Sequence, residues 1–190
     1  RAYTDEPEAW MKEGAMVLFE GQVGIIRYRK SELYQETATD FVPVDEGKVN
    51  TERANDYFSI RKAYFELAIK EQEEQTEQPH LRERLNACYD AFVAKWGFFH
   101  SNDNKEFIML DSLGVEVFTI EMQVKGDIFK SDIMREPVAF KKIDTTVQLT
   151  PGEALASCLN FYGCVDMDYL MQTTGKDEDE VIDDLKGEIF

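Results

Sequence analysis

The segment 150–190 restricts the fold more than any other part of the chain, because helix start signals, stop signals and apolar spacing agree along it. Thr150 can cap a helix, Pro151 suits the first helical position, and Glu153 can reach back to the cap amide. Gly163 is a typical helix stop, so the sequence predicts a first helix that ends there. Its apolar side chains recur at helical spacing: Ala154, Leu155, Cys158, Leu159 and Phe161.

The same segment predicts two further helices and the beginning of a strand. A short helix is expected over 166–173, ahead of a stop at Gly175. Asp177 begins a third helix, which Gly187 closes before the apolar stretch 188–190. This order of elements is typical of a helix-turn-helix that runs into a wing. We therefore predict a helix-turn-helix-like (winged-helix-like) three-helix unit at 150–190.

The order of helices in this unit suggests DNA binding, but its charge argues against that function. From residue 166 to residue 188 there are nine acidic side chains and only two lysines, Lys176 and Lys186. Duplex binding depends on Lys and Arg that neutralise phosphates, so an acidic third helix is a poor groove reader. Carboxylates also stabilise a helix N-terminus, which explains part of this charge structurally. We interpret the unit as one that packs or binds a partner, and the candidate docking residues are Tyr169, Asp177, Glu178 and Asp183.

Length and composition set the class of protein. With 190 residues, 43% of them hydrophobic, the chain can bury a core. A net charge of -17 argues against a general affinity for nucleic acid or anionic membranes. The three cysteines form no CxxC pair, and neither a signal peptide nor a long apolar run is present, so we predict a cytoplasmic location. Because the sequence begins with Arg1 rather than Met, we interpret it as a fragment of a longer protein.

Residues 1–149 are predicted to form an α+β domain with three parts. A β unit over 14–45 combines two strands about a tight turn with an edge strand that tolerates Pro43. A helical hairpin over 50–98 follows, with a broad aromatic face on its first helix. A β-hairpin region over 105–149 then leads into the terminal unit.

Further signals place the elements inside these parts. Thr51 is expected to cap the first long helix, and Pro79 begins the second. The stretch 71–78 is either the solvated end of the first helix or a linker. Two strands, 106–110 and 115–122, are expected about a tight turn. The predicted fold class is therefore α+β, with small β-hairpin units around an antiparallel helical hairpin and a C-terminal three-helix unit.

The sequence contains no recognisable catalytic, metal or cofactor motif. His80 and His100 stand at opposite ends of the second long helix, so we expect both at the surface and no shared metal site. Cys88 and Cys158 fall on predicted core faces without a neighbouring base. A Rossmann fingerprint, a Walker A motif and an adenine-methylation motif are all missing from the sequence. We predict that the fragment is not an enzyme and binds neither cofactor nor metal.

Two local basic stretches leave a nucleic-acid-binding role open. They interrupt a strongly acidic chain and could together contact a phosphate backbone. The candidate contact residues are Arg27, Arg29, Lys30, Lys125, Lys130, Lys141 and Lys142. A third alternative is that the acidic terminal helices mimic DNA towards a basic protein.

Three stretches together resemble a family of very large proteins from bacterial conjugative elements and phages. Residues 81–93, followed by Trp96 and Gly97, resemble its "LN..YD.FV...G" stretch. Residues 126–138 and 153–185 resemble further stretches of the family in the same order. The family joins an N6-adenine DNA methylase region to a Snf2-like helicase region.

The resemblance implies that the fragment connects a methylase part to a helicase part within a DNA-modification system. Its partners would be those two flanking domains, and DNA would be reached through the parent protein, with no membrane involved. S-adenosylmethionine and ATP would serve the parent only, because no catalytic motif of the family falls within this fragment. The resemblance thus implies a spacer and interaction domain.

Overall fold

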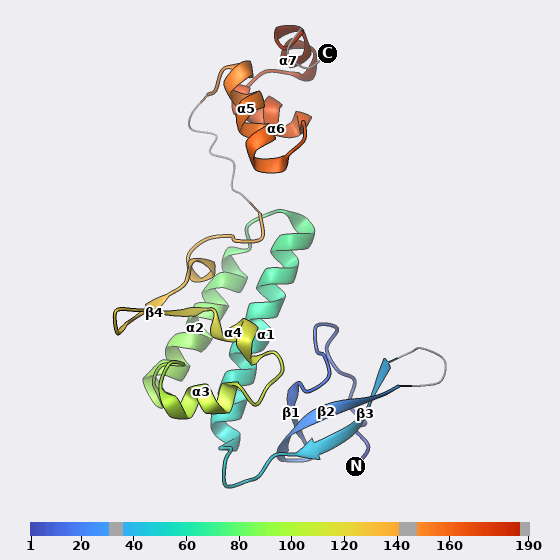
Figure 1. Cartoon of the computed structure of the whole chain (residues 1–190), viewed down its shortest axis with the longest axis vertical. Helices are drawn as coiled ribbons and strands as arrows, with labels where there is room; N and C mark the ends of the chain where they lie inside the picture. The colour runs from blue at the N-terminus through green and yellow to red at the C-terminus, as the bar shows by residue number, and fades with distance from the viewer. Residues whose placement is uncertain (31–35, 141–147, 187–190) are drawn as a thin grey trace. The chain divides into compact units, whose positions relative to one another are not determined.

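The computed structural model describes residues 1–30, 36–140 and 148–186 (Figure 1). The chain divides into two compact units, Arg1–Phe140 and Lys141–Phe190, where the sequence predicted a division after residue 149. Both small antiparallel sheets lie in the first unit, and the second unit is helical over its described residues, so the predicted α+β class is confirmed. Among the described helices, none is long and apolar enough to cross a lipid bilayer.

A three-stranded antiparallel sheet opens the first unit, in the order β1-β2-β3. Its strands are β1 (Met16–Phe19), β2 (Gln22–Lys30) and β3 (Glu36–Pro43). Glu20 and Gly21 form the turn between β1 and β2 with positive φ angles of 48° and 78°, as tight hairpins require. Pro43 ends the edge strand, as predicted.

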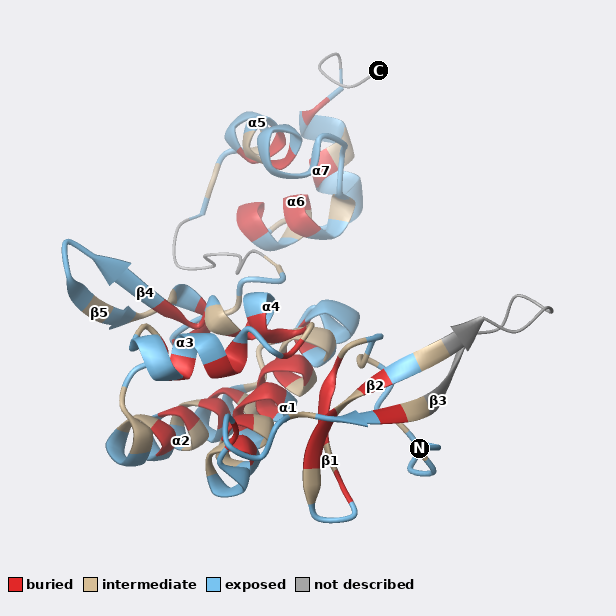
Figure 2. Ribbon diagram, turned by 60° about the horizontal axis from the view of Figure 1, so that its bottom comes forward, coloured by how far each residue is buried: buried red, intermediate tan, exposed pale blue. Residues whose placement is uncertain are grey.

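Two long helices form the body of the first unit and pack against each other as the predicted hairpin. Helix α1 (Thr51–Glu74) is capped by Asn50, whose side chain accepts a hydrogen bond from the Arg53 amide at 3.0 Å. Thr51, the predicted cap, instead lies inside the first turn because its neighbour provides the cap oxygen. Helix α2 (Pro79–Trp96) begins at the predicted proline. The largest fully buried side chains of this pair are Tyr57, Ile60, Leu67, Leu85 and Phe92, and Figure 2 shows the buried stripes of both helices.

The predicted hairpin over 106–110 and 115–122 is wrong. The chain forms α3 (Asn102–Ile108) and α4 (Gly114–Phe118) there, because its buried positions recur at helical rather than alternating spacing. Gly114 permits this packing, since a Cβ at that position would lie 2.0 Å from the Ile108 carbonyl oxygen. Residues Leu113, Val117 and Ile120 are buried, and Val115 is 68% exposed.

A β-hairpin does form, but it begins later in the chain. Strands β4 (Glu121–Val124) and β5 (Asp127–Lys130) pair in antiparallel register about a turn at Lys125 and Gly126. The short 3-10 helix η1 (Asp132–Met134) follows and packs on α2. Figure 1 shows this hairpin on the opposite side of the α1/α2 pair from the sheet β1–β3.

The second unit packs three helices around its own core. They are α5 (Pro151–Tyr162), α6 (Met167–Thr174) and α7 (Glu178–Asp184). Gly163 and Gly175 end the first two with left-handed φ angles of 68°, as predicted. The predicted strand at 188–190 lies outside the described residues. The core side chains are Ala154, Leu155, Cys158, Tyr169, Leu170, Val181 and Leu185.

The predicted capping box at the start of α5 is present and should control the acid stability of this unit. The Thr150 hydroxyl accepts from the Glu153 amide at 3.4 Å, and the Thr150 amide donates to the Glu153 carboxylate at 2.9 Å. These bonds from Thr150 lower the pKa of Glu153. At pH values above the ordinary pKa of a glutamate, the ionised Glu153 stabilises the unit. This stabilisation is lost as the pH falls through the lowered pKa.

We therefore expect Thr150→Ala to destabilise the second unit by about 1 kcal/mol near neutral pH. Glu153→Gln should remove the part of the acid sensitivity that arises at this cap. Hydrogen exchange of α5 amides, followed as a function of pH, measures both effects. The matched control is Ser59→Ala on α1, which removes an exposed hydroxyl that bonds only its own helix and should leave α5 exchange unchanged.

Candidate functional site

Among the ion pairs of the described residues, the most deeply buried joins Arg61 of α1 to Asp111 after α3. Their side chains are 2% and 0% exposed, and the Arg61 Nη1 lies 2.8 Å from Asp111 Oδ2. The same carboxylate accepts from Tyr57 at 2.7 Å and from the Met16 amide at 3.0 Å. Burial and the charge of Asp111 raise the pKa of Tyr57 well above its ordinary value. Because the Asp111 carboxylate is buried and accepts from Arg61, Tyr57 and the Met16 amide, the cluster is structural and offers no exposed acid, base or nucleophile.

A second buried carboxylate, Glu121, fixes the base of the β4–β5 hairpin. It accepts from the Tyr89 hydroxyl at 2.6 Å and from the Phe99 and His100 amides at 2.9 and 2.8 Å. The His100 ring lies against it, with Nδ1 2.7 Å from Glu121 Oε1. The prediction that His100 lies at the surface is therefore wrong: its side chain is 17% exposed, because the chain turns back onto Glu121. His80 is exposed, as predicted.

The polar residues of α2 also hold neighbouring elements rather than a ligand. Arg82 donates to Glu71 of α1 at 2.6 Å and to the Ile133 carbonyl at 3.0 Å. Asn86 donates to the Met134 carbonyl at 2.8 Å and accepts from Lys130 at 2.9 Å. These contacts clamp η1 and β5 onto α2 and give the "LN..YD" stretch of the sequence a structural role.

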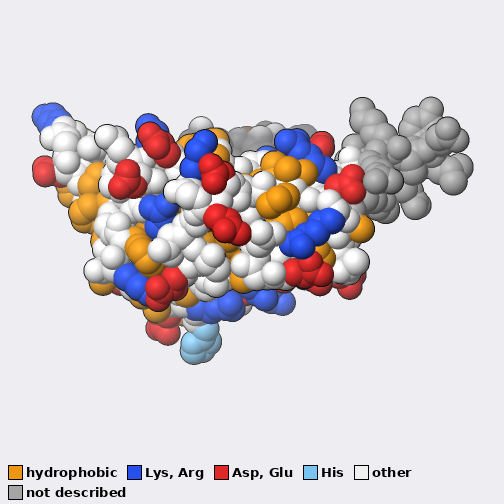
Figure 3. Space-filling view, turned by 90° about the horizontal axis from the view of Figure 1, so that it is seen from below, with side chains coloured by type: hydrophobic (Ala, Val, Ile, Leu, Met, Phe, Trp, Pro, Cys, Tyr) orange, Lys and Arg blue, Asp and Glu red, His pale blue; other side chains and the backbone are white. Residues whose placement is uncertain are grey.

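The predicted nucleic-acid contact residues are not gathered by the fold. Arg27 lies on β2, with its guanidinium 3.8 Å from Glu13, whereas Lys125 lies at the tip of the hairpin across the helix pair. Lys130 is already paired with Asp90 at 2.7 Å and lies over the Tyr89 ring. Figure 3 shows basic and acidic side chains interspersed over much of the face that it draws. The side chains of Arg29 and Lys30, and the whole of Lys141 and Lys142, lie outside what the structure describes.

A surface groove beside α3 is the next place where a ligand could be sought. Two cationic residues, Lys48 and Arg53, line it. The Arg53 guanidinium lies over the Phe107 ring at 4.6 Å and donates to Asn104 at 3.2 Å. Asp103 and Glu106 line the same groove, so its charge is mixed. Over residues 1–30, 36–140 and 148–186, no group of His, Cys, Asp and Glu is arranged to hold a metal ion.

The predicted docking residues fall into two kinds in the second unit. Tyr169 is 7% exposed, and its hydroxyl lies 2.7 Å from Ser157 Oγ, so it supports the core. Asp177 caps α7 in a second capping box, accepting from the Glu180 amide at 2.9 Å. Glu178 is exposed in the first turn of α7, and Asp183 is exposed near its end.

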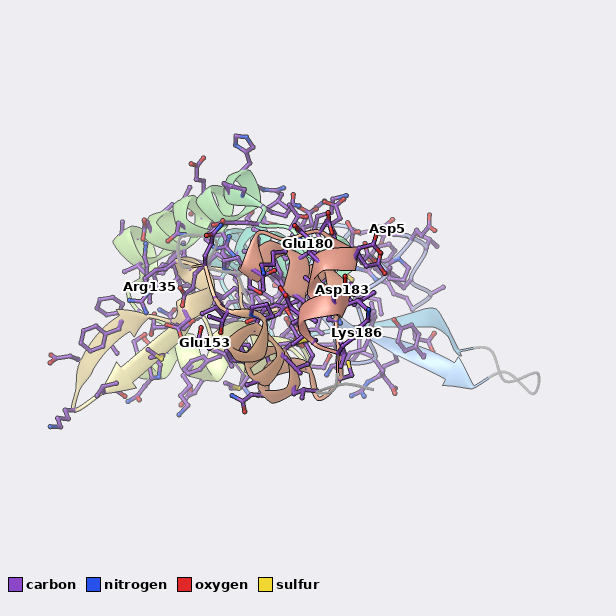
Figure 4. All side chains as sticks on the ribbon, turned by 90° about the horizontal axis from the view of Figure 1, so that it is seen from above. Asp5, Arg135, Glu153, Glu180, Asp183 and Lys186 are labelled. Atoms are coloured by element: carbon purple, nitrogen blue, oxygen red, sulfur yellow. The ribbon has the colours of Figure 1, made fainter. Side chains whose placement is uncertain are left out.

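The two lysines of the second unit's described part are both paired with α7. Lys176 binds Asp184, and this contact raises the pKa of the lysine. Lys186 binds Asp183, and Figure 4 shows this pair at the end of α7. Between residues 148 and 186 these are the only basic side chains, so the surface of α7 presents carboxylates without a free cation beside them.

The exposure of several apolar side chains in the second unit was not expected from the sequence. Leu159 and Phe161, predicted to belong to the buried stripe of α5, are each 45% exposed. Tyr162 and Val165, which follow them in the chain, are 44% and 41% exposed. The sequence signal for this exposure is that apolar residues at the end of α5 extend around the helix rather than along one stripe.

Comparison with known proteins identifies the second unit only. A family model described as "Probable helicase, winged helix domain" matches residues 148–190. This match confirms the predicted winged-helix-like character of the unit and associates the chain with helicases. Neither the curated proteins nor the solved structures contain a match to the chain.

Proposed function

We propose that the chain is a non-catalytic accessory region of a helicase-type protein and that its winged-helix unit binds protein rather than reading duplex DNA. The observation that carries this proposal is the charge of α7. In a helix-turn-helix, the reading helix must approach phosphates closely. Here Glu178 and Asp179 are exposed at its start, while Lys176 and Lys186 are paired with its carboxylates. The helix would therefore meet phosphate with unbalanced negative charge.

We further propose that the parent protein links an N6-adenine DNA methylase to a Snf2-like helicase in the cytoplasm, with this region as the spacer between them. Support comes from the ordered resemblance of the sequence. The α2 stretch that resembles the family clamps η1 and β5 through Arg82, Asn86 and Asp90. A domain that positions its neighbours must itself be rigid, and these contacts of α2 hold the first unit together. S-adenosylmethionine and ATP would then bind the parent outside this region.

A second candidate function is nucleic-acid binding through the hairpin. The association with a helicase winged-helix domain and the exposure of Lys125 at the hairpin tip favour it. The separation of Arg27 from this tip, and the pairing of Lys130 with Asp90, count against a continuous phosphate-binding surface.

Fluorescence anisotropy with labelled duplex and single-stranded DNA, measured at several salt concentrations, distinguishes the two functions. We expect no salt-dependent binding by the 190-residue chain, even at low ionic strength, because Arg27, Lys130, Lys176 and Lys186 are all within salt-bridge distance of carboxylates. As a positive control, the double variant Glu178→Lys and Asp179→Lys should gain weak binding that falls with salt. Steeply salt-dependent duplex binding by the unaltered chain would contradict the proposal, as would DNA methylation or ATP hydrolysis by it.

A further inference from the structure

We infer that the groove beside α3 binds a protein segment in which a carboxylate is followed by an apolar side chain. The groove has a volume of about 670 Å³, within the range of ligand sites, and Figure 1 shows α3 beside the first turns of α1. Its cationic residues are Lys48 and Arg53, and its apolar residues are Phe107, Met109 and Leu110. The site belongs to the first unit, so it is independent of the protein-binding role proposed for the second.

The Arg53 guanidinium is held in place before any ligand binds. It lies over the Phe107 ring at 4.6 Å, and its Nη1 donates to the Asn104 side-chain oxygen at 3.2 Å. Asn104 is only 1% exposed, and its amide nitrogen donates to the carbonyls of Trp96 and Phe98 at 2.9 Å each. A cation that is already oriented loses little side-chain entropy when it binds a ligand.

The charges of the two cations are not balanced by the described part of the chain. Neither Lys48 nor Arg53 lies within salt-bridge distance of a carboxylate of residues 1–30, 36–140 or 148–186. Arg53 donates to an uncharged amide oxygen instead. Glu46 and Glu52, which flank Lys48 in the sequence, are engaged elsewhere, because Glu46 accepts from a glutamine of β2 and Glu52 pairs with Lys95. A carboxylate from a ligand can therefore form charge-assisted hydrogen bonds here.

Met109 and Leu110 give the groove a fixed apolar surface. Their exposed fractions are 39% and 41%. Their backbone amides donate to the Lys105 and Phe107 carbonyls at 3.0 and 3.1 Å, and the next residue is the buried Asp111. Because the backbone is fixed on both sides, these side chains are displayed in the groove and can contact an apolar side chain of the ligand.

A second surface hollow meets the groove at the same two cations. It is lined by Trp96 and by residues 46–53, which include Lys48 and Arg53. An extended peptide can therefore pass from one hollow into the other, with its carboxylate against the cations and its next side chain against Met109 and Leu110.

The remaining charges of the groove favour a peptide over other anionic partners. Asp103 and Glu106 are exposed and line the same groove. They would repel the further phosphates that a nucleic acid brings with the first one. A peptide needs only one negative charge, and its backbone amides can donate to these carboxylates. A second copy of the chain would bring a net charge of -17 against the same charge.

NMR titration of the 190-residue chain with three capped peptides tests the inference. The first probe is acetyl-Ser-Glu-Leu-Leu-Ser-amide, the second replaces its Glu with Gln, and the third replaces both Leu with Ser. We expect the first peptide to shift amide signals of residues 48–53 and 107–110. The other two should bind about fivefold more weakly, because each lacks one half of the recognition. Equal binding of the three peptides, or no binding of the first at millimolar concentration, would overturn the inference.

Replacing Lys48 tests the charge with little risk to the fold, because this lysine is exposed. Lys48→Ala should weaken binding of the first peptide about threefold, and Lys48→Arg should retain it. The matched control is Lys12→Ala, which removes another exposed lysine that does not line the groove and should leave binding unchanged. Equal effects of the two alanine substitutions would show that only the net charge of the chain matters.

Replacing Leu110 tests the apolar surface. Leu110→Asn should weaken binding of the first peptide about fivefold but should not change binding of the peptide that lacks Leu. Leu159→Asn is the matched control, because this leucine of the second unit is similarly exposed, at 45% against 41%. Circular dichroism of each variant shows whether its helices are retained.

Three further outcomes would overturn the assignment in different ways. Binding that is lost with Leu159→Asn but not with Leu110→Asn would place the peptide on the second unit, and the proposed protein-binding function would stand. Duplex DNA or inorganic phosphate that displaces the first peptide and shifts the same signals at lower concentration would replace the carboxylate by a phosphate. Self-association in sedimentation that Lys48→Ala abolishes would replace the partner by a second copy.

Discussion

Replacing Asp111 with Asn is expected to destabilise the first unit by about 3 to 5 kcal/mol, the largest effect of any single substitution considered for this chain. The substitution keeps the shape of the side chain but removes the charge that faces Arg61, whose side chain is 2% exposed. A buried guanidinium without its carboxylate retains the full cost of desolvation. The Asn amide group would also turn a donor towards the donors of Tyr57 or Met16.

Urea unfolding, followed by circular dichroism, measures this loss as a lower transition midpoint. Asp132→Asn is the matched control, because Asp132 forms a salt bridge with Arg135 in which both side chains are more than 60% exposed. Exposed pairs contribute little, so the control should change stability by less than about 1 kcal/mol. Equal effects of the two substitutions would show that the buried pair does not stabilise the fold.

Replacing Glu121 with Gln is expected to destabilise the same unit by about 2 to 3 kcal/mol and to loosen the β4–β5 hairpin. The carboxylate accepts hydrogen bonds from the Tyr89 hydroxyl and from two backbone amides, and the His100 ring lies against it. The side chain of Gln has only one acceptor oxygen and cannot satisfy all of these contacts. Burial, followed by the hydrogen bond to Glu121, raises the pKa of Tyr89. The substitution should lower that pKa towards its ordinary value without restoring it fully, because the burial remains.

Hydrogen exchange at the hairpin amides and ultraviolet titration of tyrosine measure these two effects. Glu136→Gln, at an exposed position after η1, is the control and should leave both unchanged. If the substitution at Glu121 lowered global stability but left hairpin exchange as slow as before, Glu121 would not be the anchor of the hairpin.

The sequence predicts best where local signals decide the structure. The capping box at Thr150, the stops at Gly163 and Gly175 and the start of α2 at Pro79 all depend on neighbouring residues, and all are present. The predicted hairpin over 106–110 and 115–122 is wrong for the opposite reason, because local signals there do not decide the structure. Short apolar runs there fit a strand or a helix equally well, and burial in the core shared with α1 selects the helical spacing.

The buried charges could not be placed from the sequence. Asp111 and Glu121 look like two of many carboxylates in an acidic chain, and nothing local distinguishes them from exposed ones. Their burial depends on partners that are distant in the sequence, such as Met16 and Tyr89. The exposure of Leu159 and Phe161 was missed similarly, because helical spacing shows that residues share a face but not what covers that face.

The long span of the Asp111 cluster has a consequence for synthesis on the ribosome. Met16 donates to a side chain 95 residues later in the chain, so β1 emerges long before its anchor does. Until Asp111 has emerged, packing α1 on β1 would bury the Arg61 charge with the Met16 carbonyl as an acceptor but without its carboxylate. We therefore expect the sheet and α1 to pack together only after Asp111 has been synthesised, so that the first unit folds late and cooperatively. A clone that stops before Asp111 should yield an open chain rather than a smaller folded domain.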